Sequence, residues 1–173
     1  VGLSNFQKAF SDKVFWISFR NTLVYTLMVV PLVTAFSFLI ALALKENSVF
    51  SRIMRIFYIL PLVTSSVAIA FVWRWIYNPS YGILNAILGL FGVQPIRWLV
   101  SPNTALISLA ILGIWGSTSY YILIYLAGLQ NIPEELYEAA RIDGASGWQQ
   151  LIHITVPLIS PTTFFVVVTG FIG

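Results

Sequence analysis

Four long stretches of this sequence contain no charged side chain, and this feature limits what the chain can fold into more than any other. They cover residues 21–44, 56–73, 98–133 and 144–173. Crossing a bilayer core takes about 20 apolar residues in a helix. Only 9% of all residues are charged and 58% are hydrophobic, whereas an average soluble chain carries roughly 25% charged residues. The sequence therefore excludes a solvated globular domain and predicts a membrane protein.

We predict an all-α fold, a polytopic transmembrane helical bundle that forms a single domain over residues 1–173 with about four spans. The spans are expected at about 22–44, 56–73, 104–129 and 154–173. The second is short, but Arg55 and Arg74 at its ends can extend toward the headgroups. Because the last apolar run reaches Gly173 without a polar tail, we expect the sequence to be a fragment of a longer protein.

The connecting segments differ in character. Residues 1–21 place apolar side chains near helical spacing with charged residues between them, which fits a helix lying in the membrane interface. A simple juxtamembrane linker is the alternative. Residues 74–103 are aromatic and turn-rich and enclose an amphipathic stretch at 83–91. Both segments are expected on the same side of the membrane.

The numbers of Lys and Arg on the two sides do not orient the chain. The connections 45–55 and 130–153 share one side and carry Lys45, Arg52, Arg55 and Arg141. The other side carries Lys8, Lys13, Arg20, Arg74 and Arg97. The positive-inside rule gives most weight to short loops, but numbers this similar leave the orientation open.

Several function classes lack the residues that they need. No Asp, Glu, Lys, Arg or His lies in the middle of a predicted span, although ion-coupled transporters and pumps generally require such residues. The chain has no Cys and one His, so it offers no zinc ligand set. It has no phosphate-binding Gly-rich loop, and its net charge of +3 is scattered, which does not suit nucleic acid. We expect no enzyme activity and no cofactor, so uphill transport would need energy from another polypeptide.

The predicted third span contains a run of small and hydroxyl-bearing residues at 116–121. One interpretation is helix packing, because Gly113 and Ser117 form a small-x-x-x-small pair. The other is a pore-lining face that offers hydroxyl groups and an aromatic ring to a polyhydroxylated ligand. The residues alone leave both interpretations open.

The last connection, 130–153, holds four of the six acidic residues. Pro133 fits the first position of a helix, Glu134 and Glu135 suit its first turn, and Gly144 suits its end. Ser146 suits the N-cap of a second short helix. These signals predict a helix–turn–helix elbow outside the bilayer.

Two further features of the elbow concern its side chains. Glu138 and Arg141 have the i,i+3 spacing of an ion pair on a helix. A solvated loop would not need the four large apolar residues of this connection, which are Leu136, Tyr137, Trp148 and Leu151. An apolar patch with a charged rim indicates a protein partner.

Residues 132–145 read Ile-Pro-Glu-Glu-Leu-Tyr-Glu-Ala-Ala-Arg-Ile-Asp-Gly-Ala, and residues 154–157 read Ile-Thr-Val-Pro. This pattern resembles the Glu-Ala-Ala loop of permease subunits of binding-protein-dependent carbohydrate ABC importers. Further similar positions are 2–6, 21–23, 60–61, 73–75, 81–85 and 98–99, and they favour the type of the larger maltose-importer permease. Leu151 stands where the family often has Phe, and it is apolar too.

The resemblance implies a multi-pass permease of the cytoplasmic membrane. Its partners would be a second permease subunit, ATP-binding cassette ATPase subunits and an extracellular solute-binding protein. Residues 130–153 would be the cytoplasmic coupling loop, and residues 1–21 and 74–103 would face outward. Members of this type have six spans, which implies one before Val1 and one after Gly173.

The resemblance also assigns candidate site residues. Docking to the ATPase is expected at Glu138, Ala139, Ala140, Asp143, Gly144, Ala145, Trp148 and Leu151. Contact with the sugar is expected at Gly116, Ser117, Ser119 and Tyr120. The expected function is inward transport of a sugar or similar polar solute, driven by partner ATPases. A passive channel or membrane scaffold subunit is the alternative, and the sequence does not identify the solute.

Overall fold

The structure, a computed structural model, describes residues 2–46 and 48–172, which form helices joined by loops. In chain order the helices are α1 (Ser4–Ser11), α2 (Lys13–Ala43), α3 (Val49–Val63), α4 (Ser66–Ile76), α5 (Ile83–Leu90), α6 (Ala105–Gln130), α7 (Glu134–Ile142), α8 (Gly147–Gln150), the π-helical turn η1 (Leu151–Thr155) and α9 (Val156–Ile172). Three helical stretches of the described chain are long and apolar enough to cross a membrane, and the bent pair α3–α4 would be a fourth. The all-α, polytopic bundle is confirmed.

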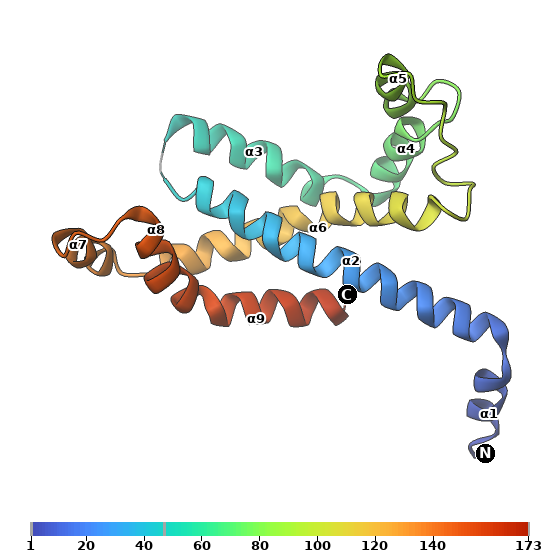
Figure 1. Ribbon diagram of the computed structural model, residues 1–173, viewed down its shortest axis with the longest axis horizontal. Helices are drawn as coiled ribbons and strands as arrows, with labels where there is room; N and C mark the ends of the chain where they lie inside the picture. The colour runs from blue at the N-terminus through green and yellow to red at the C-terminus, as the bar shows by residue number, and fades with distance from the viewer. Residues whose placement is uncertain (1, 47, 173) are drawn as a thin grey trace.

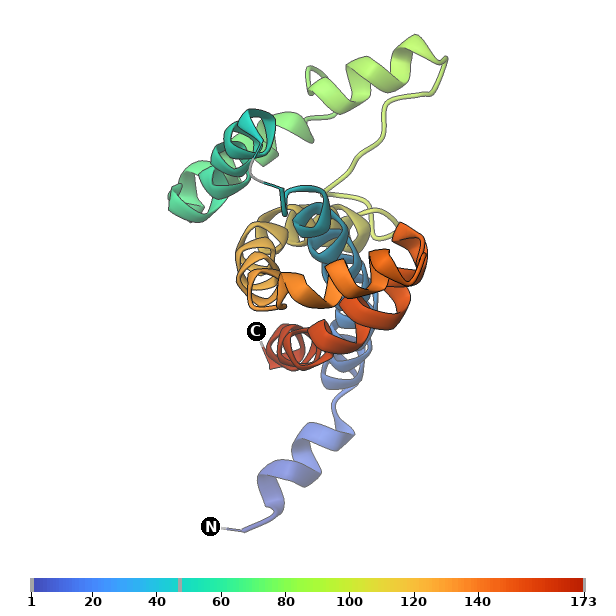
Figure 2. The same ribbon diagram turned by 90° about the vertical axis from the view of Figure 1, so that its left-hand side faces the viewer.

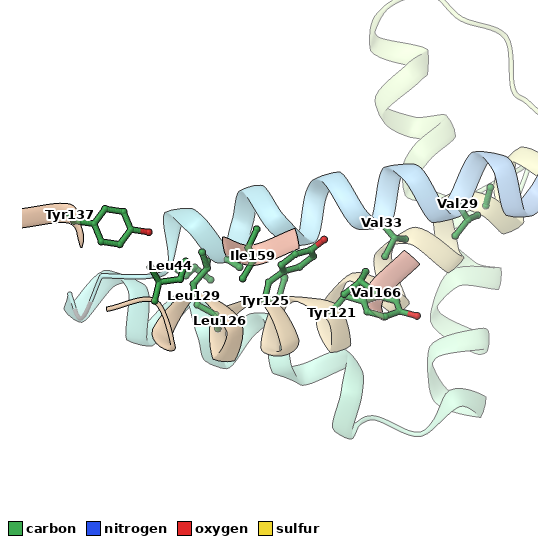
Figure 3. Packing of buried hydrophobic residues seen from close by; sticks show 14 residues of the cluster. Val29, Val33, Leu44, Tyr121, Tyr125, Leu126, Leu129, Tyr137, Ile159 and Val166 are labelled. Carbon is green, nitrogen blue, oxygen red and sulfur yellow. The ribbon is translucent and has the colours of Figure 1, made fainter. Parts of the chain in front are cut away.

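Helices α2, α6 and α9 lie side by side and form the bundle (Figures 1 and 2). Buried residues recur every three or four positions, so they lie on one face of each helix. Figure 3 shows these faces meeting in one cluster. Its main members are Val29, Val33, Ala41 and Leu44 on α2, Tyr121, Ile122, Tyr125, Leu126 and Leu129 on α6, and Ile159 and Val166 on α9. Large apolar side chains elsewhere on these helices, such as Phe164, are exposed and suit contact with lipid.

The segment predicted as the second span, 56–73, is not one helix. Helix α3 ends at Val63, and Thr64 adopts extended backbone angles. Helix α4 begins at Ser66 and leaves at 103° to α3. Pro61 has no N–H for the helix ladder, and Ser and Thr compete for backbone hydrogen bonds. Thr64 Oγ1 indeed donates to the Leu60 carbonyl at 2.7 Å. The sequence reasoning did not foresee this bend.

Residues 1–21 were expected to place a helix in the membrane interface. The structure forms α1 there and then begins α2 at Lys13, so the first long helix starts well before the predicted span at Thr22. Asp12 separates the two helices in an extended conformation and accepts a hydrogen bond from the Val14 N–H at 2.8 Å. Figure 1 shows α1 turned away from the axis of α2. The interfacial position itself stays a prediction, as do the span boundaries; Val1 and Gly173 lie outside the described residues.

The connection between α4 and α6 is organised by one buried amide. Asn85 of α5 donates through Nδ2 to the Ile96 carbonyl at 2.9 Å and accepts at Oδ1 from Trp98 Nε1 at 3.0 Å. The Tyr77 hydroxyl donates to the Ser108 carbonyl on α6 at 2.8 Å. These bonds fix the aromatic segment at the end of the bundle that also carries α1 (Figure 1).

A substitution at Gly128 can test how closely α6 packs on α9. A Cβ at Gly128 would lie 2.7 Å from both Ile159 Cδ1 and Thr162 Oγ1, whereas one at Gly116 would meet nothing within 4 Å. Overpacking costs about 1–3 kcal/mol and the gain in helix propensity is at most about 1 kcal/mol. We expect Gly128→Ala to lower the free energy of unfolding and the control Gly116→Ala to leave it unchanged or raise it. Reversible unfolding in mixed micelles measures both, and equal values would contradict the close approach.

The placement of α1 can be tested with spin labels in nanodiscs, in a background without other cysteines. Phe6 lies on the apolar face of α1 and Ser4 on the polar face, roughly half a turn away. A label at Phe6→Cys is expected to be relaxed mainly by oxygen, and the control label at Ser4→Cys mainly by a water-soluble nickel complex. The same accessibility at both positions would favour the linker interpretation of this segment.

Candidate functional site

The elbow predicted at 130–153 is formed by α7 and α8, which follow directly on α6. Figure 1 shows α7 and α8 at the end of the bundle opposite α1 and α5. Pro133 stands one residue before the first helical residue of α7, and Glu134 and Glu135 occupy the first turn. The predicted helix–turn–helix is therefore present in the described chain.

Gly144 ends α7 as the sequence predicts. Its φ of +79° is in the left-handed region, which favours glycine. The Ala145 N–H donates to the Ala140 carbonyl at 2.8 Å, and the Gly144 N–H donates to the Arg141 carbonyl at 3.1 Å. This pair of bonds is the Schellman arrangement. A side chain at position 144 would strain the turn that sets the direction of α8.

Ser146 caps α8, which confirms the sequence-based prediction. Its hydroxyl accepts from the Gln149 N–H at 3.4 Å, and the Gln149 side chain accepts from the Ser146 N–H at 2.7 Å. The two bonds together form a capping box. Gln149 at the third helical position was not singled out, although its spacing from Ser146 was the available signal.

The helix after α8 widens into the π-helical turn η1 before α9 begins. The Val156 N–H donates to the Leu151 carbonyl, five residues back. Pro157 follows, and a proline ring clashes with the carbonyl four residues before it. A wider turn at this point relieves that clash without ending the helix. The elbow is thus joined to α9 by continuous helical backbone.

Most of the predicted docking residues lie on the outer surface of the elbow. Glu138, Ala139, Asp143, Gly144 and Trp148 are exposed, whereas Ala140, Ala145 and Leu151 are half-buried. The structure adds one apolar residue that the docking prediction missed, because Ile142 is 87% exposed and Trp148 is 69% exposed. The available signal for Ile142 was its place as an apolar residue at the end of a short helix, next to the predicted stop at Gly144.

Tyr137 fastens the elbow to the rest of the chain. It is the buried residue of α7, and its hydroxyl lies 2.9 Å from Thr155 Oγ1 in η1. Lys45, which follows the end of α2, places its Nζ 4.0 Å from the centroid of the Tyr137 ring. No local pattern in the sequence predicts either partner, because both contacts join segments that are far apart along the chain.

The expected Glu138–Arg141 ion pair is replaced by another. Arg141 Nη2 lies 2.8 Å from Glu134 Oε1, two helical turns back. The Arg141 Nε also donates to the Tyr137 carbonyl at 3.2 Å, which directs the side chain toward the start of α7 and so toward Glu134. Both charged groups are exposed, and such a pair adds little stability. Glu138 is left on the outer surface of the elbow.

The predicted sugar-contacting residues of α6 do not share one face. Gly116 and Tyr120 lie on the same side, and Tyr120 is 47% exposed. Ser119 is 2% exposed and lines a largely apolar cavity of about 780 Å³ bounded by α2, α3, α4 and α6. Ser117 lines a different cavity, of about 350 Å³, between α2, α6 and α9. The structure thus keeps Gly116 and Tyr120 together and separates Ser119 from them.

The 350 Å³ cavity is unusually rich in hydroxyl groups. They belong to Thr22, Tyr25, Thr26, Thr34, Ser117 and Tyr121. Thr34 Oγ1 is buried and has no hydrogen-bond partner among residues 2–46 and 48–172. Thr118, by contrast, donates to a carbonyl of its own helix. The run at 116–121 included Ser117 and Tyr121, but sequence reasoning missed the threonines of α2, because they lie within an otherwise apolar run.

No metal site is apparent in the described part of the chain, where no three His, Asp or Glu side chains come together. The polar groups of the elbow and of the cavity are hydroxyls, amides and a few exposed charges. Such groups suit recognition of protein surfaces and of polar, uncharged ligands.

Comparisons with known proteins agree with this geometry. A family model described as "Binding-protein-dependent transport system inner membrane component" matches residues 33–173. The trehalose/maltose transport system permease protein MalF of Thermococcus litoralis is 38% identical over 93% of this chain and 55% of its own length. The arabinooligosaccharides transport system permease protein AraP of Bacillus subtilis is 34% identical over the whole of this chain and 56% of its own length.

A solved structure is similar over the whole described fold. A chain of a bacterial ABC transporter involved in the import of the acidic polysaccharide alginate has a TM-score of 0.89 and 27% sequence identity, covering 98% of this chain and 60% of that chain. The present chain therefore spans somewhat more than half the length of these relatives. The matched family, the fold and the elbow lead to one assignment: the chain belongs to the inner membrane components of binding-protein-dependent transport systems.

Proposed function

We propose that this chain is part of the permease subunit of an ABC importer that moves a sugar or a similar polar solute inward across the membrane. The observation that carries the proposal is the elbow, a pair of short helices with an exposed apolar surface at one end of a bundle whose buried cluster, among the described residues, holds no charged side chain. Relatives named for transport of trehalose and maltose, lactose, and arabinooligosaccharides support sugars as the solute class.

The elbow is the proposed docking site for a partner ATPase. Its outer surface combines the exposed apolar side chains of Ile142 and Trp148 with the carboxylates of Glu138 and Asp143. Exposed tryptophans are frequent hot spots when a partner covers them. Because α8 continues through η1 into α9, a displacement of the elbow would act directly on a membrane helix. This mechanism requires the elbow to face the cytoplasm.

We expect Trp148→Ala to weaken binding of the ATPase roughly 30-fold, which corresponds to about 2 kcal/mol. Trp148 is largely exposed, so its removal should leave the fold intact. The matched control is Trp75→Ala, since Trp75 is 51% exposed and lies on α4 at the other end of the bundle. Affinity is measured between the full-length permease complex and purified ATPase in detergent. Equal affinity of both variants and the parent protein would remove the elbow as the docking site.

Two surfaces are candidates for the solute path. The exposed side of α6 carries Gly116 and Tyr120, two of the four residues predicted from the sequence. The hydroxyl-lined cavity between α2, α6 and α9 contains Thr34 Oγ1, which has no partner among the described residues. A buried hydroxyl without a hydrogen-bond partner is destabilising. A hydrogen bond to water or to a polyhydroxylated solute would offset this cost. We propose the Tyr120 surface as the main path, because an aromatic ring can stack on a sugar ring and Tyr120 is accessible.

Tyr120→Ala is expected to raise the KM for uptake roughly fivefold, about 1 kcal/mol for loss of an aromatic contact, while leaving assembly with the partners unchanged. Thr34→Val is the parallel variant in the cavity, and Leu109→Ala is the control for an exposed residue of α6. Uptake by proteoliposomes with the complete importer measures all three. A raised KM for Thr34→Val with a normal KM for Tyr120→Ala would move the solute path into the cavity.

The alternative function is a passive channel or membrane scaffold subunit. A channel should conduct solute when this subunit is reconstituted alone, whereas an importer subunit should not transport without its ATPase. The family assignment and the elbow favour the importer, since a channel has no use for a docking surface of this kind.

A further inference from the structure

Tyr137 is the buried residue of α7 and contacts the rest of the chain. Tyr137 is 7% exposed, whereas its neighbours Leu136 and Glu138 on α7 are exposed. Figure 3 shows Tyr137 at the end of the buried cluster, beyond Leu44 of α2. The side chain contacts η1 through its hydroxyl and the end of α2 through its ring. A displacement of α7 would therefore reach the membrane helices through this residue as well as through the chain connections themselves.

Lys45, two residues beyond the last residue of α2, is the cation that contacts the Tyr137 ring. Its Nζ lies 4.0 Å from the ring centroid, within the range of an effective cation–π contact. Among the described residues no carboxylate lies close enough to Lys45 to form an ion pair, and the salt bridge of this region is the one between Arg141 and Glu134. Lys45 is half-buried, and its ammonium group lies over an aromatic face instead of beside an acidic partner.

A second cation contacts the same end of α2 from α3. Arg55 of α3 donates from Nη2 to the Leu44 carbonyl at 2.6 Å. Leu44 is the C-cap of α2, and its carbonyl has no partner within the helix. Lys45 and Arg55 therefore both act at the end of α2, one toward the elbow and the other toward α3. Cations are favourable at this end of a helix dipole.

We propose that Lys45 is a positioning residue that couples the elbow to α2 through the Tyr137 ring. A movement of α7 then reaches α2 directly, and it reaches α3 through the Leu44–Arg55 hydrogen bond, in addition to reaching α9 through η1. The inference rests on the proposed docking role of the elbow for its functional consequence. The contact itself does not depend on that role and can be tested separately.

Three variants separate charge from packing. Lys45→Met keeps an unbranched apolar side chain but removes the cation. Lys45→Arg keeps a cation that can lie over the ring. Lys8→Met is the control and removes a lysine from α1, at the far end of the chain. In the full-length chain in nanodiscs, hydrogen exchange of the amides of residues 134–142 reports how firmly α7 is held. We expect exchange to be about three- to tenfold faster in Lys45→Met and unchanged in Lys45→Arg and Lys8→Met.

The functional measurement is the amount of solute imported per ATP hydrolysed by the complete importer in proteoliposomes. A residue with only a structural role would lower the yield of assembled complex but not this ratio. We expect Lys45→Met to lower the ratio about three- to tenfold and Lys45→Arg to retain it. An unchanged ratio in Lys45→Met, or an equal loss in both variants, would overturn the coupling role.

The two proposals fail in different ways. If the parent complex hydrolyses ATP but imports no solute, the proposed function is wrong. Hydrogen exchange would still test whether Lys45 holds the elbow in place. Unchanged exchange of the α7 amides in Lys45→Met would show that it does not. If the parent complex transports normally and Lys45→Met imports as much solute per ATP as the parent, the proposed function stands and the inference is rejected.

Discussion

The packing of α2 against α6 is the contact on which the other parts of the structure depend. In hydrocarbon the hydrophobic effect does not drive helices together, so close contact and small residues must do so. Ser37, Ala41 and Ala110 are almost completely buried in this seam, and the Ser37 hydroxyl lies 3.4 Å from the Thr118 carbonyl. Helix α9 packs on the same pair, and the elbow follows from the end of α6. The seam thus fixes where each further element can attach.

Local features of the structure could be read from the sequence, and features that depend on distant contacts could not. The turn at Gly144 and the cap at Ser146 follow from backbone preferences of single residues. The contacts of Tyr137 with Thr155 and Lys45 join distant segments and had no such signal. The bend at Thr64 is an exception, because Pro61 and Thr64 are local signals that were not used. So is the pair of Arg141 with Glu134, where the Tyr137 carbonyl directs the Arg141 side chain within α7. The separation of Ser119 from Tyr120 follows from which side of α6 faces its neighbours. Counting charges did not orient the chain, because the loops carry similar numbers.

The elbow combines an exposed surface with a firm attachment, and each serves a different need. A docking surface must present apolar groups such as Trp148 to a partner, which requires exposure. A part that passes on movement must not swing freely, which requires an anchor such as Tyr137. In this chain the anchor Tyr137 lies on α7, and the exposed apolar side chains lie at the end of α7 and on α8. Short helices with one buried aromatic residue can meet both demands at little cost in conformational freedom.

The wide turn η1 determines the rotational setting of the helix that follows it. Each residue of an α-helix advances by about 100° around the axis, and η1 accommodates one residue more than an α-helical turn would. Ile159 and Val166 therefore face α6 only because this extra residue is absorbed before α9 begins. If η1 tightened to an α-helical turn, α9 would rotate and present a different set of side chains to the bundle. The irregular turn η1, next to the elbow, thus determines which side of α9 faces the bundle.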